Sequence, residues 1–280
     1  MKYSRERIFG LFRRFGGNHR FIGFIFLLVL AARDVVCQQN LYENYGRVPS
    51  LLRTDFTFKT TNMQGLDSVV NKTKFATCFP ISLNWGDSSI TWCFFSNYHP
   101  FFFEDSLKKV LASTEKAITY RNTNDTLIEI ALDLFKFDSL LDIAILSPTD
   151  DRTFLNYGAD PARVVLDLKV KSSKPNYGEK IIYTGFPKIL IYPELKRNYP
   201  LLIQGYVSQQ IDEFDKYIIQ APIFEGASGS PIFSGIDGRF LGIVYGKFRG
   251  QESLTLAINA EPIRAWIIEV LPEKYKRRMK

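Results

Sequence analysis

The sequence predicts an all-β fold, built as sandwiches or barrels and followed by one C-terminal helix. Short runs rich in β-branched and aromatic residues recur along the chain, and Gly, Pro, Asn and Asp residues separate them. Interior segments with the spacing of an amphipathic helix are almost absent. With 280 residues, of which 46% are hydrophobic and 23% charged, the chain can form one large domain or two small ones.

The first 37 residues have the composition of a targeting segment. A basic stretch precedes twelve apolar residues at positions 21–32, which as a helix would span about 18 Å, less than a bilayer core of about 30 Å. This pattern is typical of a signal peptide and predicts a protein that is secreted or enters the secretory pathway. The alternatives are an uncleaved signal anchor, which would attach the protein to a membrane through residues 21–32, and a mitochondrial presequence.

Basic side chains at the two ends of the chain account for its formal net charge of +7. The leader carries a net charge of +5 and residues 274–280 add five basic side chains, which leaves residues 38–273 near −3. Because this middle part has no excess of basic residues, nucleic acid is disfavoured as a partner.

Residues 38–74 are mixed and polar and predict an N-terminal extension with at most a short helix near residues 65–70. From Phe75 the pattern changes to strands, and a first barrel or sheet is expected over residues 75–170. Residues 104–113 have a short helical pattern. Strands are predicted at residues 75–83, 90–95, 117–121, 126–135, 142–146 and 164–170.

The polar segment 171–176, which contains one proline, is the best candidate for a linker into a second unit at residues 171–280. Strands are predicted there at residues 180–184, 201–207, 217–221, 231–233, 240–245 and 253–258. Residues 261–271 have Pro262 in their first turn and apolar residues at helical spacing, which predicts a C-terminal helix before the basic tail.

Cysteine and asparagine residues suggest two covalent features. Cys78 and Cys93 flank a Gly-Asp turn between two predicted strands, so they form either a disulfide or two buried free thiols. Asn71 and Asn124 each begin an Asn-x-Thr sequon and are candidate glycosylation sites in a secreted protein.

The turn Gly226–Pro231 lies between two predicted strands and presents Ser228 as a candidate nucleophile. Gly226 and Gly229 permit backbone angles that other residues avoid, so the serine hydroxyl can stand out of a tight turn. They also allow successive N–H groups to converge on one point, as stabilisation of an oxyanion requires. Short Gly/Ser turns are also common on protein surfaces. Whether this turn is catalytic or an ordinary surface turn therefore has to be judged from other residues of the sequence.

A serine hydroxyl needs a base, and His99 is the only histidine of the sequence outside the leader. It directly follows a predicted strand, where a rigid scaffold ends and a loop begins. The third member of a catalytic triad is a buried acid that orients the imidazole. Asp142 opens the apolar strand 142–146 and is preferred over its competitor Asp138, because apolar neighbours imply a drier site.

The order His99, Asp142, Ser228, with separations of 43 and 86 residues, resembles the chymotrypsin-like serine proteases and in particular their HtrA-type, trypsin-like branch. Six segments between about Phe75 and Ile267 are similar to motifs of this branch and follow its order: Ser96–His99, Asp142–Leu146, Tyr177–Lys180 with Gly185–Pro187, Gly205–Ser208, Gly226–Pro231 and Leu254–Ile258. The sequence departs from the family at four places, which are Pro100 with the Phe residues after it, Ala227, Ser230 and Tyr245.

The resemblance implies two six-stranded antiparallel β-barrels of the chymotrypsin type. No appended PDZ domain is expected, because the sequence has no spare length for one after the predicted C-terminal helix. It also implies a serine endopeptidase that cleaves protein or peptide substrates through an acyl-enzyme, with His99, Asp142 and Ser228 as the triad. The backbone N–H groups of Gly226 and Ser228 would form the oxyanion hole. A pocket for the residue before the scissile bond would be lined by Pro222, Tyr245, Gly246 and Lys247, and would accept an apolar or small side chain. No cofactor is expected.

Other classes of protein fit the sequence less well. An α/β-hydrolase has a Gly-x-Ser-x-Gly motif and its histidine last in the chain, whereas here Ser230 occupies the final Gly position. One histidine and two distant cysteines cannot form a zinc site, so no metal is expected. The remaining alternative is a catalytically weak or inactive protease-like binding module, which the departures around Ser228 and His99 favour.

Overall fold

The computed structural model describes residues 49–61, 67–84, 90–105, 108–112, 114–121, 126–149, 164–168, 171–186, 200–211, 215–248 and 251–270. The leader, the basic tail and Asn124 lie outside these residues. No helix in the described part of the chain is long and apolar enough to span a membrane.

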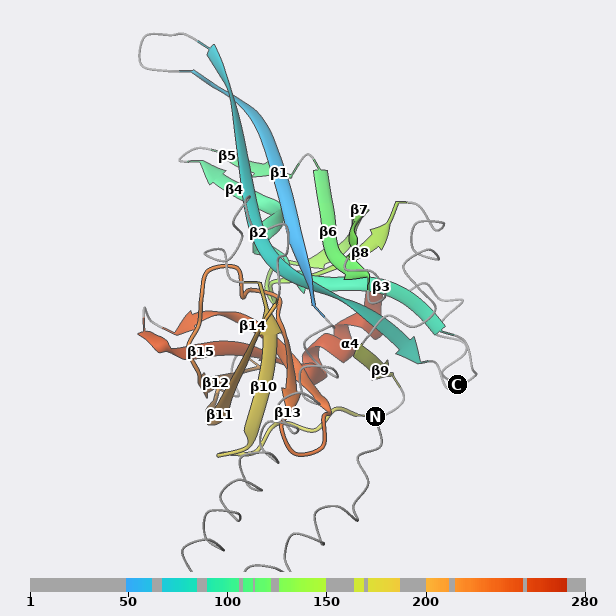
Figure 1. Cartoon of the computed structure of the whole chain (residues 1–280), viewed down its shortest axis with the longest axis vertical. Coiled ribbons are helices and arrows are strands. Elements are labelled where there is room, and N and C mark those ends of the chain that lie inside the picture. Colours follow the sequence, from blue (N-terminus) through green and yellow to red (C-terminus); the bar gives the residue numbers. More distant parts are fainter. Residues whose placement is uncertain are drawn as a thin grey trace, which may run out of the picture. The chain divides into compact units, whose positions relative to one another are not determined.

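The first half of the described chain forms a seven-stranded sheet (Figure 1). Its strands are β1 (Ser50–Thr61), β2 (Asp67–Asn84), β3 (Ile90–Asn97), β6 (Thr114–Arg121), β7 (Thr126–Asp138), β8 (Ile143–Pro148) and β9 (Val164–Asp167). The strand order in the sheet is β1-β6-β7-β8-β3-β2-β9. Because β1 also pairs with β2, all strands of this sheet except β9 form a ring of antiparallel neighbours. Strand β9 adds to β2 in parallel. The 3₁₀ turn η2 (His99–Phe101) follows β3 and leads into a two-stranded sheet of β4 (Phe102–Asp105) and β5 (Lys108–Leu111).

The second half forms a closed six-stranded antiparallel barrel followed by a helix. Its elements are β10 (Lys180–Gly185), β11 (Leu201–Ile211), β12 (Lys216–Gln220), β13 (Pro231–Ser234), β14 (Phe240–Phe248), β15 (Gln251–Asn259) and α4 (Ala260–Val270). The strands pair in the order β10-β11-β12-β15-β14-β13. The prediction of an all-β fold with two barrels and a C-terminal helix is therefore confirmed.

Strands β3 and β8 are apolar on both faces because both faces are buried. Phe94 and Ala144 pack into the core of the first sheet, whereas Phe95 and Ile145 face a second core, which the two barrels share with α4. Trp266 of α4 lies edge-on to Phe95, with ring centroids 6.4 Å apart. The shared core fixes β3 and β8, which lead to the candidate site, against the second barrel.

Two stretches of the first half differ from the prediction. Residues 50–74, expected within an extension that precedes the first barrel, supply β1 and the first part of β2, and residues 67–70 are strand rather than helix. Residues 104–105 and 108–111 belong to strands β4 and β5 rather than to a helix. In both places strand pairing prevails over the local pattern, since Ser50 to Thr61 pair in register with Cys78 to Asp67 and Phe102 to Asp105 pair with Leu111 to Lys108.

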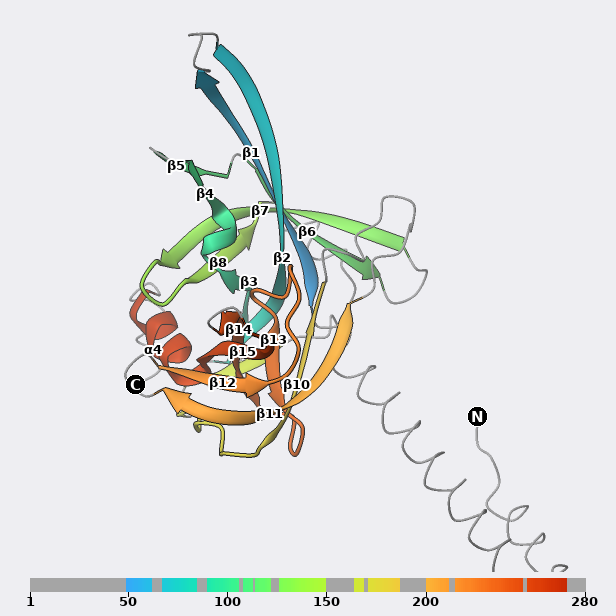
Figure 2. The same ribbon diagram turned by 90° about the vertical axis from the view of Figure 1, so that its left-hand side faces the viewer.

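The β1–β2 hairpin extends beyond the rest of the first sheet (Figures 1 and 2). Pairing between β1 and β6 ends at Asp55, so the two strands continue beyond it as a twisted two-stranded arm. Asn71, a candidate glycosylation site, is exposed on this arm, where its side-chain oxygen accepts a hydrogen bond from Thr57 Oγ1 at 3.0 Å.

The disulfide considered for Cys78 and Cys93 is not formed, and both residues are buried free cysteines. The β2–β3 register pairs Cys93 with Ile81, three residues away from Cys78. Cys78 packs into the core of the first sheet and Cys93 into the shared core, so the two thiols lie on opposite faces. Burial raises the pKa of both thiols, that of Cys93 to about 12.

The linker after the first sheet is bonded to α4. Arg264 donates to the carbonyl of Leu168 at 2.7 Å, and Glu261 accepts the N–H of Ser172 at 2.7 Å. Glu261 and Arg264 also form an ion pair, and the hydrogen bond from Arg264 holds the pKa of Glu261 below its usual value. The predicted linker thus has defined contacts at its first residues.

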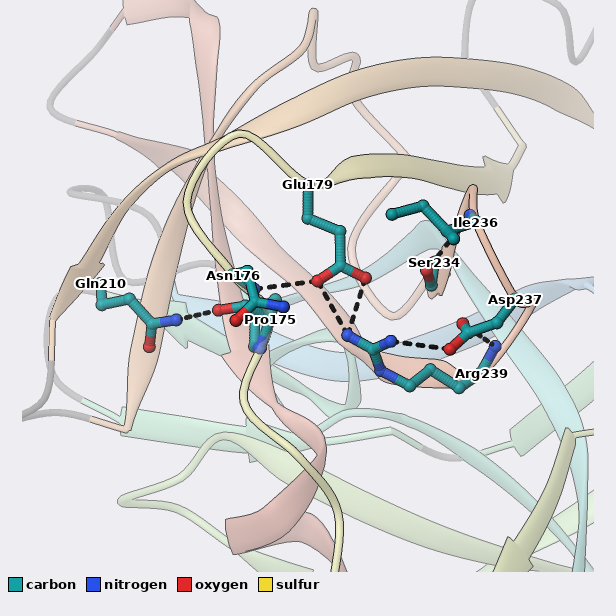
Figure 3. Close-up of polar contacts among 8 residues, drawn as sticks. All are labelled: Pro175, Asn176, Glu179, Gln210, Ser234, Ile236, Asp237 and Arg239. Atoms are coloured by element: carbon teal, nitrogen blue, oxygen red, sulfur yellow. Dashed lines mark hydrogen bonds and ion pairs between the residues drawn. The ribbon is translucent and has the colours of Figure 1, made fainter.

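A partly buried ion pair between Glu179 and Arg239 lies at the start of β10 (Figure 3). Both carboxylate oxygens of Glu179 bind Arg239 Nη2, at 2.7 and 2.8 Å, and one of them also accepts the N–H of Asn176 at 2.9 Å. Arg239 Nη1 binds the exposed carboxylate of Asp237 at 2.8 Å. These contacts join the linker to the β13–β14 turn.

Candidate active site

His99 and Asp142 form a hydrogen-bonded pair at the ends of β3 and β8. His99 Nδ1 lies 2.7 Å from Asp142 Oδ2, and the backbone N–H of His99 donates to Asp142 Oδ1, also at 2.7 Å. The Asp142 side chain is 10% exposed and that of His99 is 41% exposed. With Nδ1–H donating to the carboxylate, Nε2 is the nitrogen left to accept a proton from a substrate or nucleophile.

The backbone of Asp142 is also held by the end of β3. Its φ of 57° lies in the left-handed region, which aspartate tolerates better than most residues. Its carbonyl accepts Asn97 Nδ2 at 2.9 Å and the N–H of Tyr98 at 3.2 Å. The competing acid, Asp138, instead caps the β7–β8 turn by accepting the N–H groups of Leu140 and Leu141.

Two consecutive tight turns present Ser228. The N–H of Ala227 donates to the carbonyl of Phe224 at 3.1 Å, and the N–H of Ser230 donates to that of Ala227 at 2.9 Å. Gly226 and Gly229 occupy the third position of these turns, with φ of 98° and 84°. Type II turns have this positive φ and favour glycine there. The second turn places Ser228 at its corner, where it is partly exposed.

Two backbone N–H groups at this corner are free to bind a ligand. Among the residues that the structure describes, no protein atom accepts the N–H of Gly226 or of Ser228. By contrast, the N–H groups of Ala227, Gly229 and Ser230 donate to Phe224, Val244 and Ala227. Free N–H groups next to a candidate nucleophile are what an oxyanion hole requires.

The Ser228 turn lies against the same end of β3 that holds Asp142. A Cβ atom on Gly229 would come within 2.2 Å of the carbonyl oxygen of Thr77 and 2.5 Å of Ser96 Oγ, so only glycine allows this approach. It would also lie 3.2 Å from the backbone nitrogen of Asn97. In the described part of the chain, however, the Ser228 hydroxyl makes no hydrogen bond to His99. The structure thus joins the acid to the base and places the Ser228 turn against β3, the strand that leads to His99.

Two side chains of the β1–β2 hairpin hold the turn that carries His99. Thr54 Oγ1 donates to the carbonyl of Pro100 at 2.8 Å, and Lys74 Nζ donates to the carbonyl of Phe102 at 2.6 Å and that of His99 at 3.4 Å. Thr54 and Lys74 face each other across the β1–β2 pairing. The segment expected to precede the barrel therefore supports the candidate base.

Tyr245, one of the departures from the family pattern, lies edge-on to His99, with ring centroids 6.5 Å apart. Lys216 Nζ lies 4.0 Å from the centroid of the Tyr245 ring, a cation–π contact. Burial lowers the pKa of Lys216 and raises the pKa of Tyr245. The negative charge of Asp142 opposes the first shift and adds to the second, which places both groups within its field.

The residues expected to line a substrate pocket lie in two segments of the second barrel. Tyr245 and Gly246 are partly exposed on β14, and Lys247 and Pro222 are exposed. The carbonyl of Pro222 accepts the hydroxyl of Tyr183, whose pKa is raised by burial. Their role in specificity stays a prediction.

Thr54, Lys74, Thr77 and Lys216 were not singled out by the sequence. Thr77 had a detectable signal, because a hydroxyl inside the apolar run 75–81 needs a hydrogen-bond partner when buried. Nothing local marks the other three, whose partners come from distant segments.

No family model and no curated protein matches the chain. Solved structures of serine proteases do match it. The active form of the Rv3671c protease from M. tuberculosis is 14% identical over 84% of this chain and 86% of its own, with a TM-score of 0.55. The HtrA-type protease AlgW with a decapeptide is 13% identical (83% and 67% covered, TM-score 0.54), and a serine endoprotease from Yersinia pestis is 16% identical (85% and 66%, TM-score 0.51). The chain has the chymotrypsin-like double-barrel fold of HtrA-type serine proteases.

Proposed function

We propose that this protein is a serine endopeptidase that hydrolyses peptide bonds through Ser228, His99 and Asp142. The observation that carries the proposal is the double hydrogen bond between His99 and Asp142, because it orients the imidazole with Nε2 free. The free N–H groups of Gly226 and Ser228 support it from the other barrel.

The chemistry follows from the roles of these groups. The Ser228 hydroxyl attacks the carbonyl carbon of a peptide while His99 Nε2 takes its proton, and Asp142 stabilises the imidazolium that forms. The carbonyl oxygen, now negatively charged, is bound by the N–H groups of Gly226 and Ser228. His99 then protonates the leaving amine and activates the water that hydrolyses the acyl-enzyme.

The substrate proposed is a polypeptide, as in the neighbour solved with a decapeptide. The pocket formed by Pro222, Tyr245, Gly246 and Lys247 would receive an apolar or small side chain. For the leader we propose secretion, with residues 21–32 as the signal-peptide core and membrane anchoring or mitochondrial import as the alternatives.

Labelling with a fluorophosphonate probe tests the function directly. Wild-type protein should be labelled, Ser228→Ala should not, and His99→Ala should be labelled much more slowly. Ser230→Gly is the matched control, because it changes a serine of the same turn whose Oγ has no partner in the described structure, and it should keep the label.

Labelling that persists in Ser228→Ala would show that another residue is the nucleophile. Absence of labelling in the wild type would favour a protease-like binding module. A rate of labelling that stays flat between pH 5 and 8 would argue against a histidine base, since deprotonated imidazole is required.

A further inference from the structure

The Ser228 turn is bonded to one residue of the first sheet, Thr77 in β2, which is fully buried. The N–H of Thr77 donates to the carbonyl of Ser228 at 2.9 Å, and its Oγ1 donates to the carbonyl of Gly226 at 2.8 Å. The same Oγ1 accepts the N–H of Phe186 at 3.1 Å, just after β10. Thr77 therefore binds three residues in two segments of the second barrel, the Ser228 turn and the end of β10.

Ser96 completes the bonding of Thr77 from the neighbouring strand. Its Oγ donates to the carbonyl of Thr77 at 2.7 Å. Gly185 also approaches closely, since a Cβ atom on it would come within 2.9 Å of Thr77 Oγ1 and 2.1 Å of Ser230 Oγ. The N–H, the carbonyl and the hydroxyl of Thr77 are thus all hydrogen-bonded, and Gly185 packs closely against its side chain.

These bonds fix the orientation of peptide groups in the Ser228 turn. A trans peptide is planar, so a held carbonyl fixes the plane in which it lies. The carbonyl of Gly226 fixes the plane before Ala227, and that of Ser228 fixes the plane after Ser228. The peptide that carries the Ser228 N–H lies between these two fixed planes and has little freedom to rotate.

We propose that Thr77 is the positioning residue of the oxyanion hole. Its hydroxyl and its N–H hold the turn Phe224–Ser230 in the one conformation that leaves the N–H groups of Gly226 and Ser228 free for a substrate carbonyl. This inference rests on the proposed function and extends it: the first barrel, which carries the base and the acid, also sets the oxyanion-binding groups of the second.

The test compares Thr77→Val, which keeps the shape and removes the hydroxyl, with Thr77→Ser, which keeps the hydroxyl. Ser234→Ala is the structural control, because it removes a buried hydroxyl that accepts the N–H of Ile236 in the β13–β14 turn, away from the site. Thr77→Val should lower kcat on a peptide substrate at least about tenfold, a fraction of the loss caused by removing a whole oxyanion donor. KM should change less than about threefold, and Thr77→Ser should recover most of kcat.

Two further readouts separate positioning from general destabilisation. The pH at which activity rises should be the same in Thr77→Val and wild type, because the His99–Asp142 pair is untouched. Hydrogen exchange of the peptide that covers residues 224–230 should speed up in Thr77→Val and stay unchanged in Ser234→Ala.

Unchanged kcat in Thr77→Val, equal losses in Thr77→Val and Thr77→Ser, or a shifted pH profile would overturn the inference. Unchanged hydrogen exchange at residues 224–230 in Thr77→Val would overturn it even if the wild type proved inactive. A wild type that is neither labelled nor active, with faster exchange in Thr77→Val, would refute the proposed function and leave the positioning of the turn standing.

Discussion

Strand β10 runs between two polar clusters that differ in charge and in what they hold. Near its last residue, Gly185, the uncharged hydroxyl of Thr77 holds the Ser228 turn against the first barrel, and Ser96 Oγ in turn donates to the carbonyl of Thr77. Just before its first residue, the buried carboxylate of Glu179 holds Arg239 and the backbone of Asn176 (Figure 3).

The difference in charge matches what each cluster does: the uncharged cluster positions the candidate site, and the charged cluster stabilises the fold. A buried charge next to the free N–H groups of Gly226 and Ser228 would act strongly on a developing oxyanion, because electrostatic energies grow as the local dielectric falls. The neutral hydroxyl of Thr77 holds the turn without this effect. At the Glu179 end, away from the Ser228 turn, a charged pair can join strand ends without disturbing the chemistry.

The largest effect is expected on activity, at the candidate active site. Asp142→Asn should lower kcat by about 10⁴-fold, because the amide cannot orient and stabilise the imidazole as the carboxylate does. The midpoint of thermal unfolding should change little. Kinetics on a peptide substrate together with thermal unfolding measure both, and a loss under tenfold would mean that Asp142 has no catalytic role.

At the opposite end the expected effect is on stability. Glu179→Gln leaves Arg239 without its buried partner and should lower the free energy of unfolding by about 2–3 kcal/mol. The value of kcat below the unfolding temperature should stay within about twofold of wild type. Asp237→Asn, which removes the exposed partner of Arg239, is the control and should destabilise far less. A large fall in kcat in Glu179→Gln would end the distinction between the two clusters.

An intermediate effect is expected at Lys74, which bonds two carbonyls of the His99 turn. Lys74→Met keeps a long unbranched side chain but removes the ammonium group, whose nitrogen lies 5.8 Å from the ring centroid of Phe56 and 5.7 Å from that of Phe102. It should lower kcat about tenfold, because a displacement of a catalytic group by less than 1 Å can cost this much. Lys72→Met, on the exposed arm of the hairpin, serves as the comparison and should keep wild-type kinetics. Equal kinetics in the two variants would show that Lys74 of the β1–β2 hairpin does not support the His99 turn.

The smallest effect is expected between the linker and α4. Because the pKa of Glu261 is lowered in the folded protein, its ion pair with Arg264 stabilises the fold above the unfolded carboxyl pKa of about 4.3. This contribution is lost as the pH falls through the lower folded pKa. The difference in melting temperature between wild type and Glu261→Gln should be a few degrees at pH 7 and should shrink toward pH 3, without any change in kcat at pH 7. A difference that stays constant with pH would exclude the ion pair as its source.

Patterns within short stretches were sufficient for much of the architecture. Alternating and apolar runs predicted most strands of both halves, and Pro262 with its helical spacing predicted α4, because these features depend on neighbouring residues. The glycines at 226 and 229 predicted the tight turns around Ser228 for the same reason. Asp142 was preferred to Asp138 from its apolar neighbours, and in the structure it is the acid bonded to His99.

Much of what the sequence did not reveal depends on contacts between segments far apart in the chain. Residues 50–74 look like a polar extension until β1 pairs with both β2 and β6. Thr77 and Gly226 are 149 positions apart, and their hydrogen bond exists only because the two barrels pack through a shared core. Likewise the sequence allows a disulfide between Cys78 and Cys93, but the register of β2 and β3 places the two thiols on opposite faces of the sheet. Local patterns follow from the periodicity of each segment, whereas strand register and contacts between barrels arise when distant surfaces are buried together.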